Sequence, residues 1–216
     1  NGNLFPVEEG EFDKVQPLHL DVLYDLFNGV QIKTGQLSLF DIYDFSIIPI
    51  ELISNIYERF IGDEQQKNKK AFYTPSFLVD YILSQTVEPF LASSKNISCK
   101  VLDPSCGSGI FLVETLRKII EKYQKLKFEL TDDDLRNMVT DNIFGVDKDE
   151  NAINVAIFSL YITLLDYKEP KDIEKFKFPV LKDTNFFTAD IFDMDNVYNQ
   201  ILKSKSLDFV IGNPPW

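Results

Sequence analysis

The sequence predicts an α/β fold in which helices connect the strands of a mainly parallel sheet. From residue 71 onward, short apolar runs of strand length alternate with longer segments whose apolar residues recur at helical spacing. This alternation is typical of parallel strands joined by right-handed helical crossovers. The chain is 44% hydrophobic and 13% aromatic over 216 residues, which allows a sizeable core and argues against global disorder.

Residues 1–70 lack this alternation, and we expect them to form a small helical module. Apolar residues at helical spacing predict one helix over residues 18–27 and a second over residues 52–61. The polar segment 62–70 suits a connector. The sequence therefore predicts two parts, residues 1–70 and residues 71–216.

The first helix of the second part is predicted from a local start signal. Thr74 suits the N-cap and Pro75 the first helical position, and one apolar face then continues from Leu78 to Leu91. The further elements that we expect, in chain order, are strand 100–103, helix 111–123, a surface helix within 121–142, strand 143–147, helix 152–165, and strands 186–190 and 208–212.

Charge and composition restrict the partners and the compartment. The formal net charge of −12 argues against a grip on nucleic acid by this stretch alone, because Lys and Arg must neutralise phosphates. The basic cluster Lys67, Lys69 and Lys70 reads as a solvated loop, so contacts to DNA should come mostly from elsewhere. With 2 Cys, no leader and no apolar run of membrane-spanning length, a reducing intracellular setting is expected.

A glycine-containing turn, residues 103–109, lies between a predicted strand and a predicted helix. Glycines let the backbone approach a ligand, and the helix N-terminus offers unpaired N–H donors. A dinucleotide site fits poorly, because Leu112 stands where the third glycine is required. Asp103 would also repel a pyrophosphate, whereas it suits a cationic ligand such as the ammonium group of an amino acid.

Polar residues end each of the predicted strands. Asp147 can accept the hydroxyls of a ribose, and Asp190 can accept an exocyclic amine. Each acid alone is equally well a cap or turn residue, but three beside a glycine turn point to a site. The final run of residues 213–216 places an amide, a rigid diproline and an aromatic ring where a planar amino group can be held.

Neither a thiolate catalyst nor a zinc site is indicated. Cys106 has no patterned base beside it, and His19, the single histidine, lies in the helical module. We interpret Cys106 as a small packing residue of the turn and His19 as structural or exposed.

These motifs resemble the N6-adenine DNA methyltransferases, in the order found in type I and type IIG restriction-modification enzymes. The matching segments are residues 72–75, 103–112, 145–149, 188–192 and 213–216. The resemblance implies a Rossmann-like methyltransferase sheet that depends on S-adenosylmethionine, with its first four strands present behind the N-terminal helical module. It also implies an N-terminal fragment with little activity of its own, in a prokaryotic cytoplasm.

The resemblance assigns a role to each matching residue. Asn213 and the Pro214 carbonyl would accept the N6 amino group of a flipped adenine, beside Pro215, with Trp216 stacked on the base. Double-stranded DNA is the implied partner, with contacts mostly outside this fragment, together with a specificity or nuclease region or subunit and no membrane. The implied S-adenosylmethionine site comprises Tyr73, Thr74, Asp103, Ser105, Cys106, Gly107, Gly109, Asp147, Lys148, Asp190 and Ile191.

Two alternatives stay open on the sequence. Protein-glutamine and RNA amine methyltransferases also use an Asn-Pro-Pro-aromatic step on planar amides or amines. A non-catalytic scaffold that binds the cofactor within a larger defence complex is the second alternative.

Overall fold

The computed structural model describes Gly10 and residues 14–27, 74–93, 97–126, 129–193 and 197–214. The chain divides into two compact units, one of Asn1–Leu4 with Ile50–Trp216 and the other of Phe5–Pro49. The predicted boundary at residue 70 and the predicted helix over residues 52–61 lie outside the described residues.

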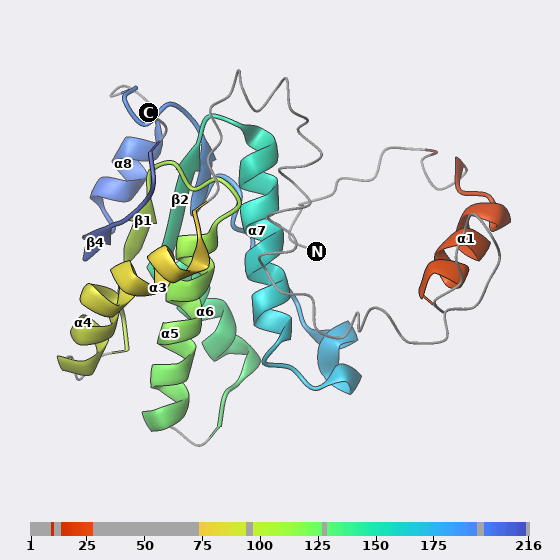
Figure 1. Cartoon of the computed structure of the whole chain (residues 1–216), viewed down its shortest axis with the longest axis horizontal. Coiled ribbons are helices and arrows are strands. Elements are labelled where there is room, and N and C mark those ends of the chain that lie inside the picture. Colours follow the sequence, from red (N-terminus) through yellow and green to blue (C-terminus); the bar gives the residue numbers. More distant parts are fainter. Residues whose placement is uncertain are drawn as a thin grey trace. The chain divides into compact units, whose positions relative to one another are not determined.

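The smaller unit contains α1 (Pro17–Phe27), which confirms the helix predicted over residues 18–27 (Figure 1). Leu18, Leu20 and Tyr24 are exposed on it. His19 is also exposed, and its Nδ1 accepts a hydrogen bond from the backbone N of Gln16 at 3.2 Å. The structure thus gives His19 a local role at the start of the helix.

The larger unit is built on a parallel sheet with the strand order β3-β2-β1-β4. The sheet confirms the predicted α/β class, and each of its strands lies within a predicted strand segment. Most residues of β1 and β2 are buried, because these strands are central and covered on both faces. The strands are β1 (Val101–Asp103), β2 (Ile143–Asp147), β3 (Phe186–Thr188) and β4 (Phe209–Val210).

Helices cover both faces of this sheet. In Figure 1, α5 and α7 run side by side along one face, and they pack against each other. Tyr198 and Leu202 of α8 pack on the other face, against Leu102 and Phe144 of the strands. The helices are α3 (Ser76–Gln85), α4 (Val87–Ser93), α5 (Ile110–Leu126), α6 (Asp132–Asn142), α7 (Glu150–Leu165), α8 (Val197–Lys203) and the 3-10 helix η2 (Pro170–Lys175).

The start of α3 differs from the sequence prediction. Pro75, with φ −58° and ψ 139°, occupies the N-cap, and the helix begins at Ser76 without a side-chain cap. The prediction that Thr74 caps this helix is therefore wrong, and its hydroxyl is available for another partner. The single helix predicted as far as Leu91 is also wrong, because it breaks at Thr86 into α3 and α4.

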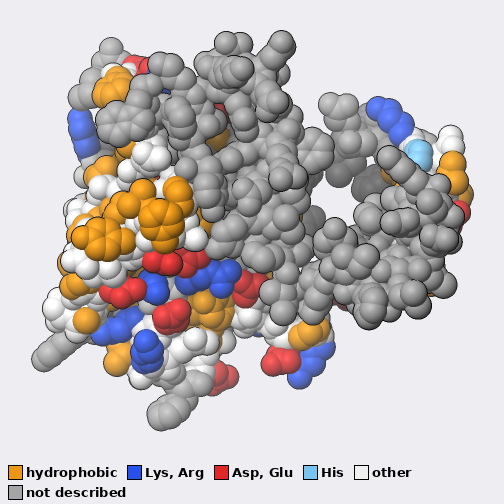
Figure 2. Space-filling model, viewed as in Figure 1, with side chains coloured by type: hydrophobic (Ala, Val, Ile, Leu, Met, Phe, Trp, Pro, Cys, Tyr) orange, Lys and Arg blue, Asp and Glu red, His pale blue; other side chains and the backbone are white. Residues whose placement is uncertain are grey.

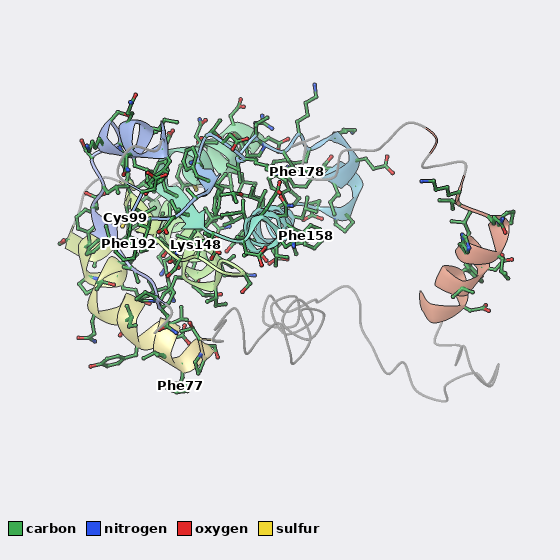
Figure 3. All side chains as sticks on the ribbon, turned by 90° about the horizontal axis from the view of Figure 1, so that it is seen from above. Phe77, Cys99, Lys148, Phe158, Phe178 and Phe192 are labelled. Carbon is green, nitrogen blue, oxygen red and sulfur yellow. The ribbon has the colours of Figure 1, made fainter. Side chains whose placement is uncertain are left out.

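The surface shown in Figure 2 carries mixed charge over α5, where acidic and basic side chains alternate. Two ion pairs account for part of this pattern, Lys118 with Glu88 at 3.0 Å and Arg117 with Asp166 at 2.7 Å. Hydrophobic side chains gather over α3, and Phe77 projects outward from this helix (Figure 3). Within the described ranges, no helix is long and apolar enough to cross a bilayer.

Candidate active site

The polar residues predicted at strand ends meet at one edge of the sheet. Because the strands are parallel, their carboxyl ends lie together, and ligands of open α/β sheets bind outside this edge. Asp103 ends β1 and Asp147 ends β2, whereas Asp190 and Asn213 follow the ends of β3 and β4 within three residues. These side chains are separated in sequence, and the sheet topology places them along one edge.

The turn after β1 is held by hydrogen bonds to β1 and β2. Asp103 Oδ1 accepts from the backbone N of Ser105 at 3.0 Å, and the backbone N of Cys106 donates to Val146 O at 3.0 Å. Asp147 Oδ2 accepts from the backbone N of Gly107 at 2.9 Å. Asp147 thereby fixes the position of the turn relative to its own strand.

The two glycines of the turn are required for different reasons. Gly107 has a φ of +52°, and a Cβ built on it would meet no atom of the described residues within 4 Å. Gly109 has a φ of +85°, and its Cβ would lie 3.0 Å from the Cβ of Ala156 in α7. Gly109 therefore allows α7 to pack closely against the turn, whereas Gly107 faces open space over the site.

The turn also fits the cofactor that the sequence implies. Ser105 Oγ is buried without a hydrogen-bond partner among the described residues, although buried hydroxyls are normally paired. The open space beside Gly107 adds room at the same turn. The turn thus combines an unpaired buried hydroxyl at Ser105 with room at Gly107, and both suit a polar ligand such as S-adenosylmethionine.

Asp103 is only 2% exposed, and burial raises its pKa to about 7. The N–H of Ser105 opposes this shift, and the negative charge of Asp147 adds to it. A buried carboxyl of this kind gains from a cationic partner, which would favour its ionised form. The environment thus suits the ammonium group expected from the sequence.

Cys106 is a packing residue, as predicted. Burial raises the pKa of its thiol well above its ordinary value, so it remains protonated at neutral pH. A Cβ added to Gly145 would lie 3.1 Å from Cys106 Sγ and 2.5 Å from the ring of Phe186. Cys106 and Phe186 therefore require glycine in β2.

Asp190 lies beyond β3 and is paired with Lys148, with Nζ of the lysine 2.8 Å from Oδ2. Its Oδ1 accepts from the backbone N of Phe192 at 3.0 Å. The bonds from Lys148 and then Phe192 lower the pKa of Asp190. Ile191 packs against the cluster beneath α8, and Phe192 is 85% exposed beside it.

The segment after β4 brings Asn213 to the same edge. The backbone N of Ile211 donates to Leu102 O at 2.9 Å, which continues the pairing with β1 beyond the last residue of β4. A Cβ added to Gly212 would lie 2.3 Å from Asp103 Oδ1, so Gly212 lies directly against that carboxyl. Sequence reasoning missed Gly212, although a glycine directly before the Asn-Pro-Pro step was a visible signal.

Asn213 also contacts the residue that precedes α3. Its Nδ2 donates to Thr74 Oγ1 at 3.3 Å, across 139 residues of sequence. The structure thus joins one predicted catalytic residue to one predicted cofactor residue. Tyr73, Pro215 and Trp216, which the sequence also assigns to the site, lie outside the described residues.

A sequence model of the N-6 DNA methylase family matches residues 49–216. The chain belongs to this family. The match includes the whole edge of the sheet described above and confirms the resemblance that the sequence motifs predicted.

Relatives of this N-6 DNA methylase domain carry consistent names. The type II restriction enzyme and methyltransferase RM.Eco57I of Escherichia coli is 27% identical, over 81% of this chain and 22% of its own length. The adenine-specific methyltransferase PglX of Streptomyces coelicolor is 25% identical, over 56% of this chain and 11% of its own length. The adenine-specific methyltransferase BrxX of Escherichia coli O9:H4 is 31% identical, over 45% of this chain and 8% of its own length. The chain therefore spans about a fifth or less of these relatives.

Proposed function

We propose that the protein carrying this chain transfers a methyl group from S-adenosylmethionine to N6 of adenine in double-stranded DNA. We further propose that it serves a restriction-modification or phage-defence system, with a specificity or nuclease region or subunit as its partner. The family match and the names of the relatives support this proposal.

The closeness of the proposed acceptor and donor residues, seen in two contacts, carries the proposal. Gly212 lies against the Asp103 carboxyl, and Asn213 donates to Thr74. The residue proposed to hold the methyl acceptor is therefore next to two residues proposed to hold the methionine end of the methyl donor. A transfer reaction requires this closeness, because positioning the two reactants supplies much of the rate enhancement.

The residues at the carboxyl edge suit each part of S-adenosylmethionine. Asp103 and Thr74 would hold its amino acid end, with Ser105, Cys106, Gly107 and Gly109 forming the turn beneath it. Asp147 would accept from the ribose hydroxyls, followed in sequence by Lys148, and Asp190 and Ile191 would contact the adenine ring. Tyr73 belongs to the same proposed cofactor segment as Thr74. When bound, S-adenosylmethionine supplies a methyl group on a positively charged sulfur, which a nucleophile can attack.

The acceptor residues address the weak nucleophilicity of adenine N6. The lone pair of this amino group is delocalised into the ring, so it must be localised before it can attack. Asn213 Oδ1 and the Pro214 carbonyl would accept its two hydrogens and draw the nitrogen toward a tetrahedral geometry. Trp216, after Pro215, would stack on the flipped base. As N6 bonds to the methyl group, the S–CH₃ bond would break, S-adenosylhomocysteine would leave, and N6 would become positively charged. Water can take the proton that N6 then loses, so no strong base is needed in this scheme.

The central test replaces the acceptor amide in the full-length protein. Asn213→Ala should lower the rate of N6-methyladenine formation in duplex DNA by roughly a hundredfold or more, as expected when a group that stabilises the transition state is removed. Mass spectrometry of digested DNA measures the product. The matched control is Asn137→Ala, because Asn137 is exposed on α6, which leads to the opposite edge of the sheet. Unchanged methylation in Asn213→Ala would refute the catalytic assignment.

The substrate is tested separately. The full-length protein is incubated with labelled cofactor and with DNA, RNA or a glutamine-containing protein. Incorporation into DNA supports the proposal, whereas incorporation only into RNA or protein would replace it by the corresponding alternative. Cofactor binding without transfer to any of them would favour a scaffold. We also propose that the 216 residues alone have little activity, because the relatives are several times longer.

A further inference from the structure

We propose that Thr74 is a positioning residue that fixes the orientation of the Asn213 amide, so that its oxygen and not its nitrogen faces the methyl acceptor. The inference rests on the proposed function, since it concerns how the same site distinguishes an amino group. It assigns to Thr74 a role toward the target base, in addition to its proposed contact with the cofactor.

The need for such a residue follows from the geometry of the two acceptors. The Pro214 carbonyl belongs to the backbone, and proline restricts the backbone around it. The Asn213 amide instead rotates about a side-chain torsion that has only broad preferences, and its two ends differ in hydrogen-bonding character. If the amide turned over, its NH₂ would meet the NH₂ of adenine, donor against donor. A site for an amino group must therefore prevent this rotation.

Thr74 is placed to prevent it. The Asn213 amide uses Nδ2 to donate to Thr74 Oγ1 at 3.3 Å, which leaves Oδ1 at the other end of the amide. Among the described residues, Thr74 is the one hydrogen-bond partner recorded for the Asn213 side chain. A hydroxyl can also donate, so this bond selects the amide orientation when the hydrogen of Thr74 is given to a different acceptor.

Thr74 is itself well fixed. It is 7% exposed, and threonine is stiff about its first side-chain torsion because its Cβ is branched. Its hydroxyl does not cap α3, because Pro75 occupies the N-cap and no side chain caps the helix. A buried hydroxyl that is not used by its own helix, and that contacts the acceptor amide instead, is better explained by the site than by the helix.

The role is compatible with a cofactor contact. A hydroxyl has two lone pairs and one hydrogen, so accepting from Asn213 leaves the Thr74 hydrogen for the methionine end of the cofactor. Once that hydrogen is donated to the cofactor, the Thr74 oxygen can only accept, and the Asn213 amide must present its nitrogen to it. Binding of the cofactor and binding of the target adenine would then be linked through Thr74.

The test measures DNA binding in the presence of S-adenosylhomocysteine, which keeps the amino acid end of the cofactor and has no methyl group to transfer, so it does not depend on turnover. Once the target sequence is known from sequencing of methylated DNA, two duplexes are compared that carry adenine or purine at the target position. Purine lacks the amino group. The ratio of the two affinities reports how well the full-length protein accepts that group, and a comparison between variants removes the intrinsic difference between the duplexes.

Thr74→Val keeps the shape of the side chain and removes the hydroxyl. We expect it to lower the adenine-over-purine affinity ratio by about tenfold, the effect of one lost hydrogen bond to a favourably oriented amide. Thr74→Ser, which restores the hydroxyl, should keep the ratio of the natural protein. Thr74→Ala should lower the affinity ratio as Thr74→Val does. Agreement between the two variants excludes a folding defect that is specific to valine.

The matched control is Thr86→Val, at the opposite end of α3. Thr86 Oγ1 also donates a hydrogen bond, to Ile82 O at 2.7 Å, so the control loses one hydroxyl contact without touching Asn213. It should leave the ratio unchanged. If the natural protein methylates adenine but Thr74→Val and Thr74→Ala keep its affinity ratio, the inference is overturned while the proposed function stands. If the natural protein methylates no adenine, the proposed function fails first.

Discussion

At the amino edge of the sheet, Asn142 uses both ends of its side-chain amide, whereas at the carboxyl edge Asn213 uses one. Asn142 Oδ1 accepts from the backbone N of Cys99 at 2.8 Å, and its Nδ2 donates to Met138 O at 2.8 Å. The hydrogen bond recorded for the Asn213 amide within the described ranges is the donation to Thr74. Within the described residues, the Asn142 amide has hydrogen-bond partners at both its oxygen and its nitrogen, whereas the Asn213 amide has one at its nitrogen.

The carboxylates repeat this contrast. At the amino edge, Asp208 Oδ2 accepts from the backbone N of Lys100 at 2.7 Å and joins β4 to β1. At the carboxyl edge, Asp103 is buried with a raised pKa, and Ser105 Oγ lacks a partner among the described residues. Buried hydroxyls are normally paired, so the unpaired Ser105 Oγ beside a buried carboxyl suits the proposed cofactor site. We therefore interpret the amino edge as the one that stabilises the fold and the carboxyl edge as the proposed binding edge.

The largest effect should come from neutralising the buried carboxyl of Asp103. The folded pKa of Asp103 is raised from 3.8 to about 7, so the folded chain holds the proton more tightly than the unfolded chain. Its stability therefore falls as the pH rises between these values, and the loss is complete above pH 7. Asp103→Asn removes this loss, and we expect it to raise the free energy of unfolding at pH 8 by up to roughly 4 kcal/mol.

Chemical denaturation followed by circular dichroism at pH 5 and pH 8 measures this effect. The gain should be larger at pH 8 than at pH 5, because at pH 5 the folded Asp103 is already protonated. The variant should also lose affinity for the cofactor. Equal stability of the variant and the natural chain at pH 8 would show that the ionised Asp103 carboxylate does not destabilise the folded chain.

The second prediction addresses the amino edge. Asn142→Ala removes the partner of the Cys99 N–H, of Ser98 Oγ and of Met138 O, and it leaves buried polar groups unpaired. We expect the free energy of unfolding to fall by about 3 kcal/mol. Asn213→Ala is the comparison, and its stability should change by no more than about 0.5 kcal/mol. A larger loss in Asn213→Ala than in Asn142→Ala would reverse the assignment of the two edges.

The third prediction compares two glycines of the carboxyl edge. Gly212→Ala places a Cβ 2.3 Å from Asp103 Oδ1, so the strand end or the turn must shift, at a cost of about 2 kcal/mol. In Gly107→Ala the added Cβ meets no atom within 4 Å in the described part of the chain, and the cost of about 1 kcal/mol comes from the positive φ. Thermal unfolding should rank the two in this order. Gly107→Ala should instead weaken cofactor binding more than it weakens folding, because it fills open space in the site.

The parts of the fold that the sequence predicted are those with a strong local pattern. Strands β1 and β2 are buried on both faces, so they are visible in the sequence as short continuous apolar runs. Helix α5 buries the side chains from Ile110 to Tyr123 that recur at helical spacing. Helix α8 has no comparable pattern, since Tyr198 and Leu202 are its buried residues with described side chains, and the sequence did not predict it.

The positions of the candidate site residues at the strand ends were predictable, but their contacts were not. Three acids were expected at strand ends, and Asp103, Asp147 and Asp190 lie at or just beyond the ends of their strands. The bond between Thr74 and Asn213 joins residues 139 positions apart, and no local pattern encodes it. Local reasoning instead gave Thr74 to the helix that follows it. Packing between distant parts of the chain, and not the local helix-start pattern, determines that the Thr74 hydroxyl contacts Asn213 and does not cap α3.

The smallest effect should come from the exposed ion pair, which tests whether the carboxyl edge is uniform. Lys148 lowers the pKa of Asp190, which is the opposite of the shift at Asp103 on the same edge. A carboxylate with a lowered pKa adds stability above its unfolded pKa and loses it as the pH falls through its folded pKa.

In Lys148→Gln the pKa of Asp190 should rise, as a ¹³C NMR titration of the carboxyl can show. Because exposed pairs contribute little, we expect no measurable change in unfolding at neutral pH. Lys182→Gln, which breaks another surface pair, should leave the Asp190 titration unchanged. An unchanged Asp190 titration in Lys148→Gln would mean that the N–H of Phe192, and not the lysine, keeps this carboxylate ionised.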